Sequence, residues 1–136
     1  MKKSNWLRLL YGYIDVHSKT IYTLGQNDCV RFCCGAIEAM TGVDHWPELG
    51  GHYSTRAEAI AFIRAMAGDL TKFVTQKTGY EAIPVAFAQR GDLVIYEDEK
   101  GKHLAICVGE NFTAFREDGF IYLPMSKNVT AAWRVA

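Results

Sequence analysis

The stretch LGQNDCVRFCCGAIEAMTG, residues 24–42, sets the polar pair Asn27 and Asp28 at the start of an otherwise almost wholly apolar segment. Apolar side chains recur through it at helical spacing, and Gly42 can take the left-handed conformation that ends many helices. Because the segment is apolar nearly all round, the pattern predicts a buried central helix that begins near Asp28. The rest of the fold should form around this helix.

Two more helices are predicted in the first half of the chain. Apolar residues from Trp6 to Ile14 follow Ser4, a residue type common at helix N-caps. Further on, Thr55 and Glu58 have the spacing of a capping box, ahead of an apolar stripe that ends before Gly68. The segment VDHWPELGGHY between the second and third helices contains a proline and a glycine pair, and it is expected to form an ordered loop.

The period of the pattern becomes extended from Gly91 onward. Short glycine-containing links between the strand-like runs make neighbouring strands antiparallel. We therefore predict an α+β fold of one domain, residues 1–136, with N-terminal helices packed on a C-terminal antiparallel meander of about five strands. The predicted strands are Leu93–Glu97, His103–Val108, Phe112–Arg116, Phe120–Met125 and Ala131–Val135.

Composition and charge exclude several classes of partner. Lysine plus arginine number 15 and aspartate plus glutamate number 15, so no net charge attracts nucleic acid or an anionic membrane. No window approaches the roughly 20 apolar residues that a membrane span needs. Arg8 and Asp15 interrupt the apolar N-terminal stretch, so no signal peptide is predicted. We expect a protein that is cytoplasmic as synthesised, with neither nucleic acid nor membrane as partner.

The four cysteines are expected to be thiols rather than disulfides, because no export signal is predicted. Cys29 stands at the helix start, where the dipole and the free N–H groups lower a thiol pKa. Cys33 and Cys34 lie one turn deeper, where burial raises the pKa. Their C-x3-C-C spacing matches no zinc knuckle, so we expect neither a metal nor another cofactor.

A nucleophilic thiol also needs a nearby base, and His103 is the histidine that opens a strand. Strand alternation puts His103 on one face with Ala105 and Cys107. If that face meets the central helix, His103 can reach Cys29. Trp46 and Tyr53 lie beside Gly50-Gly51 in the loop, and two interpretations are open. Both residues line a substrate groove, or Trp46 anchors its loop on the core, which we expect.

The segments YTLGQNDC and RGDLVIYEDEKGKHLAICVG together resemble the NlpC-type papain-like peptidases of bacterial cell walls. The match has four parts in order, and it covers most of the chain. The flanking segments resemble the small phage and prophage branch that is associated with tail assembly. The matching residues are Tyr22 and Gly25 in a turn, Asp28-Cys29 at a helix start, Gly91–Val94 on a strand, and His103 with Gly109 on the next.

The resemblance implies a papain-like fold and a cysteine peptidase or amidase. Cys29 would be the nucleophile and His103 its base, and the substrates would be γ-D-glutamyl-diamino acid bonds of peptidoglycan stem peptides. Tyr22 would hold the oxyanion, or it is a core aromatic residue. Asp28 would cap the helix or shape the mouth of the site. Phage tail proteins are the implied partners.

The resemblance also implies a polar residue that orients the histidine, on the strand after the histidine strand. Ala114 or Phe115 occupies the expected place, and the nearest polar residues are Asn111 and Thr113. Two alternatives to the peptidase therefore stay open. One is a catalytically degenerate structural or binding module of a phage tail, and the other is a papain-like acyltransferase.

Overall fold

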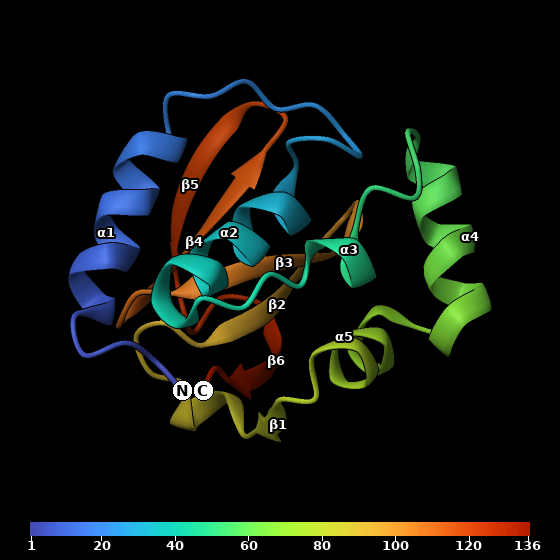
Figure 1. Ribbon diagram of the computed structural model, residues 1–136. Helices are drawn as coiled ribbons and strands as arrows, with labels where there is room; N and C mark the ends of the chain where they lie inside the picture. The colour runs from blue at the N-terminus through green and yellow to red at the C-terminus, as the bar shows by residue number, and fades with distance from the viewer.

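The central helix forms where the sequence predicts it. In the computed structural model, which describes residues 1–136, helix α2 (Cys29–Thr41) lies against a six-stranded sheet (Figure 1). Asp28 is its N-cap, and its carboxylate accepts a hydrogen bond from the Arg31 N–H at 2.9 Å. Gly42 ends the helix in the left-handed conformation, with φ +83°. Buried apolar residues on several sides of α2 confirm that it is the core helix.

The other two predicted helices are also present. Helix α1 (Trp6–His17) begins behind Asn5 rather than Ser4, so the predicted N-cap residue was wrong. Helix α4 (Arg56–Ala67) has the predicted cap, because the Thr55 side chain accepts from the Glu58 N–H. None of the residues of α4 is buried, and the helix lies at the edge of the molecule (Figure 1). Ile63 of the apolar stripe packs against the larger core from outside, whereas Ile60 and Met66 are exposed.

Three helical segments were not predicted. Helix α3 (Trp46–Leu49) is a single turn inside the segment expected to be a loop. Helix α5 (Leu70–Thr78) starts directly after Gly68, with Asp69 as its N-cap. A short 3₁₀ turn, η1 (Val85–Phe87), precedes the main sheet. None of the helices is long and apolar enough to cross a membrane.

The sheet is antiparallel throughout and has the strand order β1-β6-β2-β3-β4-β5. The structure thus has the predicted α+β fold, with N-terminal helices packed on a C-terminal antiparallel sheet. The strands are β1 (Glu81–Ile83), β2 (Leu93–Asp98), β3 (Gly101–Cys107), β4 (Asn111–Arg116), β5 (Gly119–Pro124) and β6 (Val129–Arg134).

The prediction of one continuous meander is wrong for the last strand. Strands β2 to β5 follow one another, but β6 returns across the sheet and pairs with β2 and β1. Trp133 explains this return, because its side chain is fully buried beside Leu93 and its indole N–H donates to Thr75 Oγ1 at 2.9 Å. Burying this large side chain stabilises β6 between β1 and β2.

The two faces of the sheet have separate cores. Leu104 and Ile106 of β3 belong to the larger core, together with the apolar side chains of α2. Ala105 and Cys107 belong to a smaller core on the opposite face. The face that His103 shares with Ala105 and Cys107 therefore does not meet the central helix. The expectation that this face would bring His103 to Cys29 is wrong.

Asp92, from the GDLV stretch, has a structural role at the start of β2. Its side chain is fully buried and forms an ion pair with Arg134 Nε at 3.0 Å. The carboxylate also accepts hydrogen bonds from the N–H groups of Gln89 and Val135. Asp92 therefore ties the start of β2 to the segment that follows η1 and to the C-terminal residues.

Candidate active site

A tight turn ahead of α2 fixes the position of Cys29. The N–H groups of Gln26 and Asn27 both donate to the Thr23 carbonyl, and the Gly25 N–H donates to Asp28 Oδ2 at 2.8 Å. Gly25 has φ +82°, and a Cβ at this position would overlap the carbonyl oxygen of Tyr53. Only glycine fits there, so the YxxG turn holds the start of α2, and with it Cys29, in one position.

Cys29 lies where two strands of the sheet separate. Strands β3 and β4 are paired only at Ile106↔Thr113 and Cys107↔Phe112, so the first part of β3 has no partner on that side. Helix α2 begins in this opening, and the backbone N–H of Leu104 points to the Cys29 sulfur. Since His103 precedes Leu104, the separation of the strands brings the start of β3 to the thiol.

Two cavities adjoin this position, and Cys29 and His103 line both of them. The first has a volume of about 270 Å³ and is lined mainly by charged and polar residues of the β2–β3 and β4–β5 turns. The second, of about 390 Å³, has apolar walls that include Ile60 and Ile63 of α4. A more open depression of about 570 Å³ between α1 and α2 contains no cysteine. The predicted pair therefore shares one cleft with two chemically different arms.

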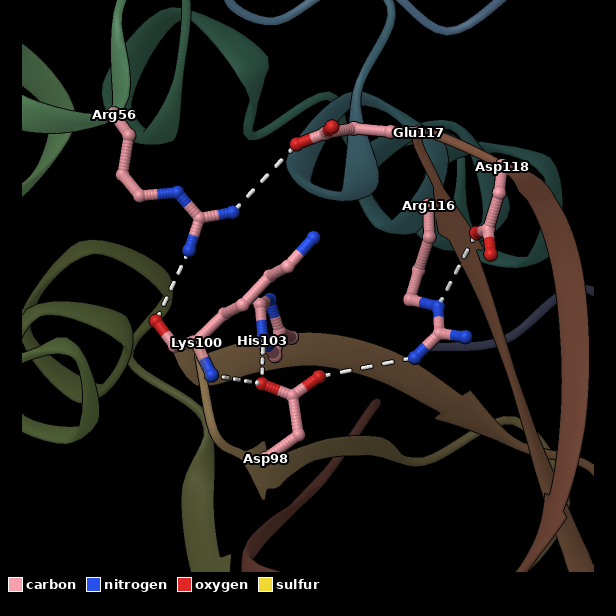
Figure 2. A network of polar contacts seen from close by, with 7 residues as sticks. All are labelled: Arg56, Asp98, Lys100, His103, Arg116, Glu117 and Asp118. Atoms are coloured by element: carbon pink, nitrogen blue, oxygen red, sulfur yellow. Dashed lines mark hydrogen bonds and ion pairs between the residues drawn. The ribbon is translucent and has the colours of Figure 1, made fainter.

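His103 has an orienting partner in Asp98, the last residue of β2. His103 Nε2 lies 2.8 Å from Asp98 Oδ1, and the same oxygen accepts the Lys100 N–H at 2.9 Å (Figure 2). The Tyr96 ring packs against the imidazole with a centroid separation of 5.1 Å. Because Nε2 faces the carboxylate, Nδ1 is the nitrogen left to act on a thiol.

Asp98 is held as an anion in this position. Partial burial acts to raise its pKa, but the hydrogen bonds from His103 and from the Lys100 N–H outweigh burial and lower the pKa below its ordinary value. Arg116 Nη1, 3.7 Å from Asp98 Oδ2, acts in the same direction (Figure 2). A carboxylate of this kind fixes the imidazole ring and stabilises its protonated form.

The expectation that the orienting residue lies on the strand after His103 is wrong. Thr113 is fully buried and pairs with Ile106, and Asn111 is exposed at the opposite end of β4. The true partner precedes the histidine. In the β2–β3 hairpin Tyr96 stands opposite His103 and Asp98 opposite Gly101, so Asp98 is a diagonal neighbour of His103 on one face. The spacing of Asp98 and His103 in EDEKGKH, combined with a tight hairpin turn, could have predicted this pair.

The expectation of a lowered pKa for Cys29 is wrong. Burial and, after it, the Asp28 carboxylate raise the pKa of this thiol to about 12. The N–H groups of Leu104, Val30 and Cys29 act in the opposite direction but do not outweigh burial. Cys29 is therefore a thiol at rest. The pKa values of Cys33 and Cys34 are also raised by burial, as the sequence predicted.

Tyr22 and Asp28 have distinct roles beside Cys29. Asp28 is fully buried and both carboxylate oxygens accept hydrogen bonds from backbone N–H groups, which confirms the helix cap. Tyr22 lines both cavities, and its ring packs edge-on against Phe115. Burial and the neighbouring Cys29 raise the pKa of Tyr22 well above its ordinary value, so its hydroxyl keeps the proton that a donor needs.

Of the two aromatic residues in the loop, one anchors the loop and the other lines the cleft. Trp46 packs on the core and lies directly against Gly50, so it anchors the loop. Tyr53 is nearly buried and lines the apolar cavity.

The remaining histidines lie away from the cleft. His17 packs among phenylalanine rings, His45 bonds to the Tyr80 hydroxyl, and His52 bonds to the Pro47 carbonyl. The chain brings together no group of three His, Cys, Asp or Glu side chains that could hold a metal ion.

The sequence model of a family described as a domain of unknown function, DUF6950, matches residues 1–135. No curated protein matches the chain.

Proposed function

Because this chain belongs to the DUF6950 family, a domain of unknown function, we propose its function from the cleft itself. The protein is a cysteine amidase or endopeptidase that hydrolyses amide bonds in peptidoglycan stem peptides. The observation that supports this most strongly is the arrangement of Cys29, His103 and Asp98, in which the nucleophile and the base line one cleft and the base has an anionic partner at 2.8 Å.

The proposed reaction starts from a neutral thiol. As the Cys29 sulfur attacks the amide carbonyl, His103 Nδ1 takes the thiol proton, so no thiolate needs to accumulate at rest. Asp98 stabilises the imidazolium that forms. The imidazolium then gives its proton to the leaving amine, and the C–N bond breaks to leave a thioester on Cys29.

In this mechanism three groups would donate hydrogen bonds to the oxyanion. The N–H groups of Cys29 and Val30 are at the start of α2, where they have no intrahelical partner. Tyr22, whose hydroxyl makes no hydrogen bond within the protein, lines the same cleft. Such donors stabilise the charge that develops in the transition state. Water, deprotonated by His103, then hydrolyses the thioester.

The choice of substrate and setting comes from the resemblance to NlpC-type peptidases. The YxxG turn, the Asp-Cys pair and the histidine strand each have a structural counterpart in the cleft. We propose that the protein is encoded by a phage or prophage, is made in the cytoplasm, and acts on the cell wall in association with tail proteins.

A second candidate function is a catalytically degenerate tail module. The raised pKa of Cys29 favours it, because a buried thiol beside a carboxylate is a poor nucleophile. The well-formed pair of His103 and Asp98 favours the enzyme, since an inactive module does not need it.

Digestion of purified muropeptides under reducing conditions tests the proposal. The wild-type protein should release stem-peptide fragments, Cys29→Ala should release none, and Cys107→Ala should behave as wild type because that thiol faces the opposite core. Products from Cys29→Ala, or none from the wild type, would contradict the proposed function.

A further inference from the structure

Arg116, the last residue of β4, contacts the carboxylate oxygen of Asp98 that His103 leaves free. Asp98 Oδ1 lies 2.8 Å from His103 Nε2 and also accepts the Lys100 N–H. Asp98 Oδ2 instead forms an ion pair with Arg116 Nη1 at 3.7 Å (Figure 2). The carboxylate is thus held between the histidine of its own hairpin and an arginine of another strand.

The register of the sheet shows that Arg116 reaches across an opening. Strands β3 and β4 are paired at two positions only, and the same register continued would put Arg116 opposite His103. The strands separate before that point, and the Arg116 side chain ends beside Asp98, on the strand beyond β3. The ion pair therefore connects β4 to the β2–β3 hairpin where the hydrogen-bond ladder does not.

The pair with Asp98 is the more shielded of two ion pairs that Arg116 makes. The side chains of Arg116 and Asp98 are 35% and 20% exposed. Asp118 Oδ1 lies 3.6 Å from Arg116 Nε, but the Asp118 side chain is 76% exposed (Figure 2). Water and salt weaken an ion pair less when both of its groups are partly buried. The charge of the guanidinium therefore acts more strongly on Asp98 than on Asp118.

Arg116 also adjoins Tyr96, the second residue that contacts the imidazole. The Tyr96 ring lies between His103 and Phe112, with centroid separations of 5.1 and 4.8 Å. Burial raises the pKa of the Tyr96 hydroxyl, and Arg116 is near enough to oppose part of this rise. One guanidinium is thus a neighbour of both side chains that fix the histidine ring.

We propose that Arg116 is a positioning residue that acts on catalysis through Asp98. By holding Oδ2, the guanidinium keeps the carboxylate in the orientation in which Oδ1 faces His103 Nε2, so that Nδ1 remains directed to the thiol. The positive charge also weakens the attraction between Asp98 and the imidazolium, and the fixed geometry outweighs this loss. The role of Arg116 rests on the proposed amidase function, to which it adds a residue that need not touch the substrate.

A double-mutant cycle with Asp98 tests this role. Arg116→Gln should lower kcat on a stem peptide about tenfold with little change in KM, because the carboxylate stays but is no longer fixed. In the Asp98→Ala background the same substitution should change kcat by less than about twofold, since no carboxylate remains to be positioned. Arg116→Lys keeps the charge and should recover part of the loss.

Two results of the cycle would overturn the proposal. An equal loss of kcat in both backgrounds would show that Arg116 acts independently of Asp98. A rise of kcat in Arg116→Gln would show that the charge of Arg116 only opposes the imidazolium.

Asp118→Asn is the matched control. It removes the other carboxylate beside Arg116 and leaves an Asn-Gly pair, which suits the turn between β4 and β5. This variant should retain kcat within about twofold of the wild type. A loss as large as that of Arg116→Gln would show instead that Arg116 serves the β4–β5 turn. Circular dichroism on each variant shows that it is folded.

NMR of the His103 ring nitrogens gives a result that does not depend on turnover. The chemical shifts of the neutral wild-type imidazole should be those of the tautomer protonated at Nε2. Arg116→Gln should move both shifts toward those of mixed tautomers, and Asp98→Ala should move them further. Unchanged shifts in Arg116→Gln would overturn its positioning role and leave the amidase standing. If the wild type cleaves no stem peptide, the amidase proposal fails, and the catalytic role of Arg116 fails with it.

Discussion

Asp98 and His103 face each other across the turn of the β2–β3 hairpin, with 2.8 Å between Asp98 Oδ1 and His103 Nε2. The two residues lie on adjacent strands joined by a short turn, so the local hairpin register alone determines their separation. In the proposed mechanism, one hairpin therefore supplies both the base and its orienting group, and the proposed nucleophile comes from a distant segment.

Replacing Asp98 tests its orienting role. Asp98→Ala should lower kcat by about 100-fold, because the imidazole loses both its fixed orientation and the charge that stabilises its protonated form. Asp98→Asn keeps an acceptor oxygen and should lose less. Steady-state kinetics on a stem peptide measures both, with circular dichroism to show that the variants are folded.

Asn111→Ala and Thr113→Val are the matched controls for this prediction. Asn111 is exposed at the far end of β4, and the buried Thr113 hydroxyl has no hydrogen-bond partner. Both variants should retain kcat within about twofold of the wild type. A large loss of kcat in either variant, with kcat unchanged in Asp98→Ala, would show that the residue orienting His103 lies on β4.

The pKa of Cys29 predicts how its alkylation depends on pH. With a pKa of about 12, the thiolate fraction is far below half at neutral pH and grows about tenfold per pH unit. The rate of iodoacetamide labelling at Cys29, followed by peptide mapping, should therefore keep rising between pH 7 and 10. A plateau below pH 8 would show instead a thiolate–imidazolium pair at rest.

Asp28 should be a main source of local stability. Asp28→Ala removes the cap of α2 and leaves the N–H groups of Gly25 and Arg31 without acceptors, at a cost of about 3 kcal/mol in the free energy of unfolding. Thr55→Ala removes the exposed cap of α4 and should cost about 1 kcal/mol. Urea unfolding measures both free energies of unfolding. Equal losses in the two variants would contradict the larger contribution that we expect from the buried cap at Asp28.

His17 should make stability depend on pH. Burial, with a smaller contribution from Arg31, lowers its pKa below the ordinary value of 6.5, so the unfolded chain binds more protons in mildly acidic solution. Stability is therefore fully present above pH 6.5 and falls as the pH drops through the folded-state pKa. His17→Phe, among the surrounding phenylalanine rings, should reduce the loss of stability between pH 7.5 and 5.5. An unchanged loss in this variant would show that His17 is not the cause of the pH dependence.

The elements that the sequence predicted well have local signals. Helix α2 has a cap, an apolar pattern and a terminal glycine within residues 24–42, and strands β2 to β5 are separated by short turns. The return of β6 to β2 had no such signal, because it depends on burying Trp133 against a distant part of the core. Helix α5 was missed because Gly68, a helix-ending residue, stands directly before its cap Asp69.

The candidate site shows the same division. The positions of Cys29 at a helix start and of His103 at the start of a strand region were readable, since each depends on neighbouring residues. The partner Asp98 was missed because the predicted strands end at Glu97 and begin at His103, whereas the hairpin extends to the pair Asp98 and Gly101. The raised pKa of Cys29 depends on burial, which only the packed fold defines.

The most direct test of the central claim is to trap the covalent intermediate. Wild-type protein would be mixed with a stem peptide, quenched in acid within its first turnovers, and analysed by peptide mapping and mass spectrometry. We predict that the acyl part of the peptide is attached to Cys29 as a thioester and is absent from Cys33, Cys34 and Cys107. Release of product with Cys29 unmodified, and at the same rate by Cys29→Ala, would contradict the assignment of this cysteine as the nucleophile.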